Sequence, residues 1–259
     1  MYFFGQGHIM KQLDSILPWL YEDTSRSMNI LIRGPSGWGK TRMAFMICNY
    51  LTGGKFEYCL GDNLVFNTKQ RVHFIDEVHL LKDPEPLYPL MDEGKYVIIL
   101  ATNDVDILKE ALSNRCTQFI FSAYSLPELR AIAQPALQCN VPLEFLDYII
   151  ESGNNNPRVI IKDIIHRLNI IVGMNQNLLA GMSLEQFKLF LQDTFGIEDG
   201  MDVMCSRYLQ VLLDLGGTAS LTTLSSVLHI DSGTLRYYVE PSLLFKHKIR
   251  ITSKGRSLV

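Results

Sequence analysis

The run Gly-Pro-Ser-Gly-Trp-Gly-Lys-Thr at residues 34–41 constrains the fold of this chain more than any other feature. It fits the pattern G-x-x-x-x-G-K-[ST] of a phosphate-binding loop. The apolar residues 29–32 precede it as a predicted strand, and residues 42–51 follow it as a predicted helix. A chance glycine-rich turn before a helix is the alternative interpretation, but a strand, this loop and a helix are the context that the motif requires. The sequence therefore predicts an α/β domain that binds a nucleoside triphosphate.

The residue types of this loop suit the chemistry of a bound triphosphate. Glycines allow backbone N–H groups to turn toward phosphate oxygens, and the N-terminus of the following helix adds partial positive charge. We expect Lys40 to reach the β- and γ-phosphates and the Thr41 hydroxyl to ligate Mg²⁺. ATP and Mg²⁺ are therefore the expected cofactors.

Two acids follow a second apolar stretch, residues 71–75. Ligands bind open α/β sheets at the carboxyl ends of the strands, where Asp76 would hold Mg²⁺, directly or through water. Glu77 would orient or deprotonate the attacking water. Paired acids after a strand can instead cap the next helix. Asn103, which ends another predicted strand, could bond the same water or the γ-phosphate, although asparagine is also common in turns.

Two arginines are candidates for a further catalytic cation, because phosphoryl transfer develops negative charge beyond what one lysine neutralises. Arg115 precedes the last predicted strand of the α/β domain, and Arg158 follows Pro157 at the start of a predicted helix. Our hypothesis is that Arg115 acts in the site of a neighbouring subunit, while Arg158 closes a lid over its own site. Either residue can also be an ordinary surface arginine.

The hydrophobic pattern predicts three domains. Short apolar strands separated by helical stretches favour a parallel sheet covered on both faces, which we place at residues 1–123. Residues 124–199 show helical patterns and no strand signal, which predicts a helical lid domain. Residues 200–259 show three short helices and then two short strands around a turn, which predicts a winged-helix domain. The predicted strands are residues 29–32, 71–75, 96–100, 118–121, 245–252 and 257–259, and the predicted helices beyond the loop motif are residues 8–22, 143–152, 157–172, 183–194, 202–215, 220–228 and 231–238.

Composition adds less than charge distribution does. Over 259 residues the formal net charge is −3, which does not by itself indicate a nucleic-acid-binding protein. The C-terminal residues 240–259, however, carry one acid, Glu240, against several basic residues. These are Lys246, Lys248, Arg250, Lys254 and Arg256. The excess predicts contact with a polyanion, and a solvated basic face is the alternative.

The cysteines and the N-terminus indicate the compartment. Five scattered cysteines form no CxxC pair, so neither a zinc site nor a disulfide framework is expected. A reducing compartment, the cytoplasm, follows as the expectation. We predict neither a signal peptide nor a membrane-spanning segment.

The order of these motifs resembles the AAA+ ATPases and, more narrowly, the RuvB family of hexameric motors that drive branch migration of Holliday junctions. The stretches that carry the resemblance are residues 4–6, 73–80, 87–92, 101–103, 114–116, 156–158, 215–221, 239–244 and 250–256. The resemblance covers nearly the whole chain. It implies ATP hydrolysis, self-association into a hexameric ring, and binding of duplex or junction DNA largely without sequence specificity.

The resemblance and the motifs together give the expected site residues. The nucleotide is expected to contact Phe4, Gly5, Gly34, Pro35, Ser36, Gly37, Trp38, Gly39, Lys40, Thr41, Arg42 and Arg158. Catalysis is assigned to Lys40, Glu77, Asn103, Arg115 and Arg158, and Mg²⁺ to Thr41 and Asp76. DNA phosphates are expected at Lys248, Arg250, Lys254 and Arg256, with protein docking by the winged helix as the alternative.

Two departures from the family pattern bear on partners. The family carries a β-hairpin that grips its partner RuvA, but here only residues 93–95 separate Asp92 from the strand at Tyr96. We therefore predict that the hairpin is absent and that another protein replaces RuvA. The chain also has Ser113 where the family has an additional arginine, and Arg115-Cys116 resembles clamp-loader subunits.

Three functional hypotheses remain open from the sequence. The first is an oligomeric ATP-driven DNA motor that acts in recombination, repair or replication. The second is a clamp-loader-like ATPase that assembles on DNA and recruits or releases a protein. The third is a scaffold with structural ATP, against which the set of Lys40, Asp76, Glu77 and Asn103 argues.

Overall fold

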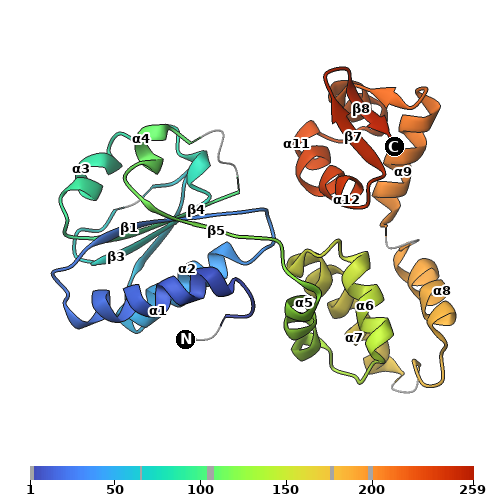
Figure 1. Cartoon of the computed structure of the whole chain (residues 1–259), viewed down its shortest axis with the longest axis horizontal. Coiled ribbons are helices and arrows are strands. Elements are labelled where there is room, and N and C mark those ends of the chain that lie inside the picture. The colour runs from blue at the N-terminus through green and yellow to red at the C-terminus, as the bar shows by residue number, and fades with distance from the viewer. Residues whose placement is uncertain (1–2, 65, 104–107, 176–177, 198–200) are drawn as a thin grey trace. The chain divides into compact units, whose positions relative to one another are not determined.

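Five parallel strands form the sheet that carries the phosphate-binding loop, in the order β2-β3-β4-β1-β5 (Figure 1). The computed structural model describes residues 3–64, 66–103, 108–175, 178–197 and 201–259. The chain divides into two units, Met1–Ser125 and Leu126–Val259, and the sheet belongs to the first. Its strands are β1 (Met28–Arg33), β2 (Glu57–Leu60), β3 (Val72–Asp76), β4 (Val97–Thr102) and β5 (Thr117–Ile120).

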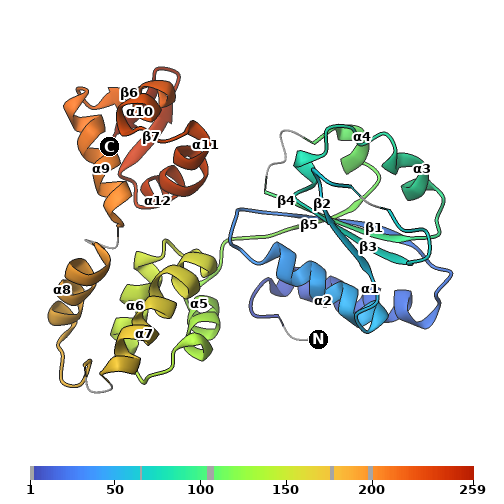
Figure 2. The ribbon, with the colours of Figure 1, turned by 180° about the vertical axis from the view of Figure 1, so that it is seen from behind.

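Helices cover both faces of this sheet, as predicted. Helices α1 (Gly7–Glu22) and α2 (Lys40–Thr52) lie on one face, and α3 (Leu87–Asp92) and α4 (Glu110–Ser113) lie on the other (Figures 1 and 2). Every residue of β4 is buried, which explains its continuous apolar sequence. The short helix η1 (Val78–Leu80) follows β3.

Strand β2 was missed by the sequence analysis. It is an edge strand of four residues, Glu57–Leu60, and only Cys59 in it is buried. A strand with one buried position has no apolar run to reveal it. Its pairing with β3, in which Cys59 lies opposite Ile75, is what defines it.

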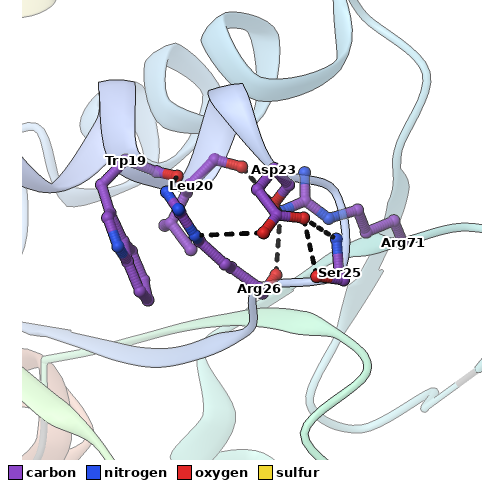
Figure 3. A network of polar contacts seen from close by, with 6 residues as sticks. All are labelled: Trp19, Leu20, Asp23, Ser25, Arg26 and Arg71. Carbon is purple, nitrogen blue, oxygen red and sulfur yellow. Dashed lines mark hydrogen bonds and ion pairs between the residues drawn. The ribbon is translucent and has the colours of Figure 1, made fainter.

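The polar segment between α1 and β1 is held by Arg71, just before β3 (Figure 3). The Nη2 atom of Arg71 donates to the carbonyl oxygens of Leu20 at 2.8 Å, Arg26 at 2.9 Å and Asp23 at 3.4 Å. The Asp23 carboxylate accepts from both the backbone N–H and the hydroxyl of Ser25, which lowers the pKa of Asp23. One guanidinium therefore satisfies the Leu20 carbonyl in the last turn of α1, which the helix leaves without a donor, and ties the following segment to the start of β3.

The N-terminal part of the second unit is helical, as predicted. Within the described residues 126–175 and 178–197, no strand is present. Ser183 and Gln186 form a capping box at the start of α8, and Phe145 stacks on Phe187 with ring centroids 4.2 Å apart. The helices are α5 (Leu126–Ala133), η2 (Gln134–Ala136), α6 (Leu143–Ser152), the π-helix η3 (Val159–Ile165), α7 (His166–Met174) and α8 (Leu184–Phe195). The predicted domain boundary at 199–200 lies outside the described residues.

The C-terminal part is a winged helix, as predicted, with a three-stranded antiparallel sheet in the order β6-β8-β7. The two-residue strand β6 was missed because so short a segment carries no periodicity. Gly255 begins β8 at φ 125°, and a Cβ there would lie 2.3 Å from the carbonyl oxygen of Ala219, so the turn requires glycine. The elements are α9 (Val203–Asp214), β6 (Thr218–Ala219), α10 (Leu221–Leu228), α11 (Ser232–Thr234), η4 (Leu235–Val239), α12 (Glu240–Phe245), β7 (Ile249–Thr252) and β8 (Gly255–Leu258).

Candidate nucleotide site and basic C-terminal surface

The phosphate-binding loop runs from the end of β1 to the first turn of α2, as the motif predicts. Gly37 and Gly39 have φ angles of 82° and 96°, which residues other than glycine rarely adopt. A Cβ at Gly34 would lie 2.7 Å from Cβ of Phe121, so the loop packs tightly on the residue after β5. The loop therefore has the turned backbone and close packing that a phosphate cradle needs.

Lys40, the first residue of α2, points into this loop. Its side chain is almost fully buried, and Nζ donates to the carbonyl oxygen of Pro35 at 3.0 Å. A buried ammonium spanning the loop is placed to meet phosphate oxygens there.

The two predicted Mg²⁺ ligands lie in direct contact. The hydroxyl of Thr41 donates to Oδ2 of Asp76 at 2.9 Å, and the backbone N–H of Glu77 donates to Oδ1 of Asp76 at 3.0 Å. Within the described part of the chain, no group of three or more His, Cys, Asp or Glu residues could hold a metal. The hydroxyl and the carboxylate are oxygen donors, which suit a cation of the Mg²⁺ type that takes one or two protein oxygens and completes its shell with phosphate and water.

Glu77 has a strained backbone, and one oxygen of its carboxylate is buried beside His79. Its φ is 50°, in the left-handed region that non-glycine residues seldom occupy. Oε2 is buried, makes no hydrogen bond with any described residue, and lies 3.4 Å from Nδ1 of His79. The same Nδ1 lies 3.1 Å from Oγ1 of Thr102, the last residue of β4. Asn103 follows Thr102, so the sheet brings Glu77 and Asn103 to the ends of adjacent parallel strands.

The N-terminal segment is fastened beside the loop. Gln6 exchanges two hydrogen bonds with the backbone of Ser122, from Nε2 to the carbonyl oxygen at 2.8 Å and from the backbone N–H to Oε1 at 2.9 Å. Phe3 packs edge-on against Phe121. Phe4 and Gly5, the predicted nucleotide contacts, therefore belong to a segment that is fixed near the loop, although their contact with nucleotide stays a prediction.

Trp38 packs against Tyr124. The ring centroids are 5.8 Å apart, and the Tyr124 hydroxyl donates to the carbonyl oxygen of Trp38 at 2.7 Å. The sequence analysis expected Trp38 to contact the nucleotide and did not single out Tyr124, which has no motif around it. Ser36 and Arg42 belong to the loop and to α2, and their contact with nucleotide stays a prediction.

Arg115 is engaged within its own subunit. Its Nε donates to both carboxylate oxygens of Asp92, at 3.0 and 3.2 Å, and one Nη donates to the carbonyl oxygen of Ala111 at 2.8 Å. The guanidinium also lies over the ring of Tyr88, 4.6 Å from its centroid. These contacts fasten the segment before β5 to α3. A role in a neighbouring site stays a prediction, as does that of Arg158, which belongs to the second unit.

The basic C-terminal residues divide into two kinds. Lys248 precedes β7, Arg250 lies in β7 and Lys254 lies in the turn between β7 and β8, and all three are exposed. Arg256 instead forms a bidentate ion pair with Glu240, at 2.7 Å from Nε and 3.1 Å from Nη2. The sequence analysis grouped Arg256 with the DNA contacts. Its ion pair with the buried carboxylate of Glu240 indicates a role in stabilising the winged helix, and a contact with DNA stays a prediction.

A third residue completes this pair. The Tyr208 hydroxyl donates to Oε1 of Glu240 at 2.9 Å, and Glu240 is 1% exposed. Burial and the hydrogen bond that its hydroxyl donates to Glu240 raise the pKa of Tyr208, and the hydrogen bonds that Arg256 donates to Glu240 raise the pKa of Arg256. The group joins α9, α12 and β8, and no sequence motif marked Glu240.

All five cysteines are free thiols, and burial raises the pKa of Cys48 to about 12. Among the helices that the structure describes, none has the length and apolar character needed to cross a membrane.

Comparison with protein families gives two matches. The family model described as "ATPase family associated with various cellular activities (AAA)" matches residues 30–124, and the model described as "RuvB C-terminal winged helix domain" matches residues 198–259. The first spans the phosphate-binding loop, the acid pair and Arg115. The second spans the helices and strands around the basic surface.

Similar proteins cover almost the whole chain. The Holliday junction branch migration complex subunit RuvB of Campylobacter hominis is 27% identical over 295 residues, covering 98% of this chain and 84% of that protein. The protein of the same name from Ehrlichia ruminantium is 26% identical over 290 residues, covering 98% and 86%.

Solved structures match in fold. The Thermotoga maritima RuvB Holliday junction branch migration motor has a TM-score of 0.84 at 23% identity, covering 99% of this chain and 92% of that one. Domain III of the Thermotoga maritima replication initiation protein DnaA has a TM-score of 0.56 at 18% identity and covers 74% of this chain. The fold of the α/β unit, the helical part and the winged helix is thus one found in solved proteins.

Proposed function

Since this chain belongs to the RuvB family of AAA+ ATPases, we propose that it hydrolyses ATP to move DNA, as a branch migration motor. The observation that carries the proposal is the contact between Thr41 and Asp76, beside a buried Lys40 and next to Glu77. Loop, metal ligands and base meet at one end of the sheet, and the chain also carries a winged helix with an exposed basic turn.

The side chains divide the work of hydrolysis. Mg²⁺–ATP, when bound, supplies the phosphoryl group and neutralises part of its charge. Backbone N–H groups of the loop and Lys40 bind the phosphates, while Thr41 and Asp76 would hold the metal. Glu77 accepts a proton from the attacking water, and Asn103 donates a hydrogen bond that orients the water or the γ-phosphate.

DNA is proposed to bind at Lys248, Arg250 and Lys254, whose charges face solvent. Phosphate contacts give affinity without reading sequence, which suits a protein that translocates. We further propose self-association into a ring, a hexamer, and a protein partner other than RuvA, because residues 93–96 alone join α3 to β4. A cytoplasmic location stays a prediction.

ATPase and strand-exchange assays with three DNAs test the proposal. We expect four-way junction DNA to stimulate ATP turnover more than duplex or forked DNA. Branch migration should then separate the junction into two duplex products. Stimulation without strand movement would support the loader hypothesis, which Arg115-Cys116 favours. If none of the three DNAs gave measurable ATP turnover, the proposal would be contradicted, and only the hypothesis of a scaffold with structural ATP would remain.

Arg115 is proposed to complete the site of the adjacent subunit. Arg115→Ala should lower ATP turnover of the assembled protein by about tenfold, a part of what an arginine supplied in trans contributes. Asp92→Asn keeps the guanidinium and is the matched control, which should keep most turnover. The assay is steady-state hydrolysis at protein concentrations that give full assembly on DNA.

Mixing variants tests whether the arginine acts in trans. A subunit with Arg115→Ala retains Glu77, and a subunit with Glu77→Gln retains Arg115. If Arg115 serves a neighbour, mixing these two weak variants should raise turnover above that of either alone, because some interfaces combine both intact residues. Additive, unrestored activity would contradict the assignment, and Arg115 would then be only the clamp between α3 and the segment before β5.

A further inference from the structure

His79 is the residue that faces the buried oxygen of Glu77. It lies in η1, directly after the acid pair, and its side chain is mostly buried. Its Nδ1 lies 3.4 Å from Oε2 of Glu77 and 3.1 Å from Oγ1 of Thr102. One ring nitrogen therefore stands between the proposed base and the end of the strand that leads to Asn103.

The proton on this nitrogen follows from its neighbours. A carboxylate oxygen offers only lone pairs, and Oε2 of Glu77 is buried without a hydrogen bond to any described residue. A lone pair on Nδ1 at that distance would repel it, so Nδ1 carries the hydrogen. The hydroxyl of Thr102 can accept from the same N–H and so fixes the plane of the ring.

We infer that His79 is a positioning residue for Glu77, acting through Nδ1–H. By attracting Oε2 inward, it leaves Oε1 as the oxygen that faces the water to be activated. The strained left-handed backbone of Glu77 supports this, since such a conformation persists where the surroundings fix it and clusters at functional sites. The inference rests on the proposed hydrolysis by Glu77 and adds what orients that carboxylate.

Two amide substitutions of His79 separate the inference from a packing role. The amide nitrogen of asparagine can occupy the place of Nδ1, whereas that of glutamine reaches the place of Nε2. We expect His79→Ala and His79→Gln to lower kcat about tenfold, a fraction of the 10² to 10⁴ that a positioned base contributes. His79→Asn should retain at least half of the wild-type kcat. KM for ATP should stay within about twofold in all three variants, because an interaction realised only during chemistry leaves binding unchanged.

Binding and coupling are measured beside turnover. Titration with a fluorescent non-hydrolysable ATP analogue gives Kd and the fraction of competent sites, to which kcat is normalised, so a partly unfolded variant still yields a value. Adding His79→Ala to Glu77→Gln should lower turnover no further, because the carboxylate that His79 orients is already gone. An additional tenfold loss in that background would overturn the inference.

The outcomes also separate this inference from the proposed function. Equal kcat for the asparagine and glutamine variants, or wild-type kcat in all three, overturns the role of Nδ1 while Glu77-dependent turnover of the wild type stands. If the wild type shows no turnover that Glu77→Gln removes, the proposed function fails and the inference with it.

Discussion

Replacing Glu77 by glutamine is expected to lower ATP turnover by about 10² to 10⁴ while leaving ATP bound. Glutamine keeps the size of the side chain and a polar group near His79, but it cannot accept a proton from water. A positioned base contributes about 10² to 10⁴ in rate, which corresponds to roughly 3–5 kcal/mol of the barrier. The proposed magnesium ligands Thr41 and Asp76 are unaltered in this variant, so affinity for the nucleotide should change little.

Lys40→Ala is the comparison variant, because it removes a group proposed to bind phosphate and leaves the proposed base Glu77 in place. Its ammonium is buried at the loop, 3.0 Å from the carbonyl oxygen of Pro35, so its loss removes a charge-assisted contact with phosphate. Binding should weaken together with turnover. Single-turnover hydrolysis and equilibrium titration with a fluorescent ATP analogue distinguish the two variants. A Glu77→Gln protein that turns over within tenfold of the wild type, or a Lys40→Ala protein with unchanged affinity, would contradict the assignment of these residues.

Replacing Arg256 by alanine is expected to destabilise the winged helix by about 3–5 kcal/mol, since it leaves a buried carboxylate without its charged partner. Glu240 is 1% exposed and accepts from Arg256 and Tyr208, so water cannot replace the lost cation freely. Glu240→Gln removes the charge and keeps a hydrogen-bonding group. The double variant should therefore recover part of the stability that Arg256→Ala loses, as measured by thermal and urea unfolding.

Lys254→Ala provides the control for DNA binding. Lys254 is exposed in the β7–β8 turn, so its loss should leave the free energy of unfolding nearly unchanged. It should instead reduce the slope of log K against log salt by about 0.9, the value for one phosphate contact on duplex DNA. A lower salt slope with full stability in the Arg256 variant would show that this arginine contacts DNA after all, as the sequence alone suggested.

The candidate site could be predicted where its chemistry is local in sequence. The phosphate-binding loop places Lys40 and Thr41 by its own backbone geometry. The acid pair lies at the end of a strand whose apolar run is visible in the sequence. Parallel strands end at one edge of a sheet, so the two short motifs bring Thr41 and Asp76 together, and a hydrogen bond of 2.9 Å joins them. Their binding of Mg²⁺ stays a prediction.

Residues with two plausible partners could not be assigned in this way. Arg115 and Arg256 both have a basic side chain at a position where a phosphate contact is reasonable, yet both pair with acids of their own chain, Asp92 and Glu240. His79 lies two residues from Glu77, but its position between that carboxylate and Thr102 depends on the pairing of β3 with β4.

The sequence by itself determined the class of each domain, the buried strands of the α/β sheet and the chemistry of the loop, because apolar periodicity and glycine-rich turns act within a few residues. Only the tertiary structure decided which charges are available and which are committed, and where the edge strands β2 and β6 lie. Such features depend on contacts between segments far apart in the chain, as when Gln6 binds Ser122. They also depend on burial, because a buried ion pair cannot be broken without loss of stability. No local pattern encodes those pairings, since each partner alone resembles an ordinary surface or loop residue.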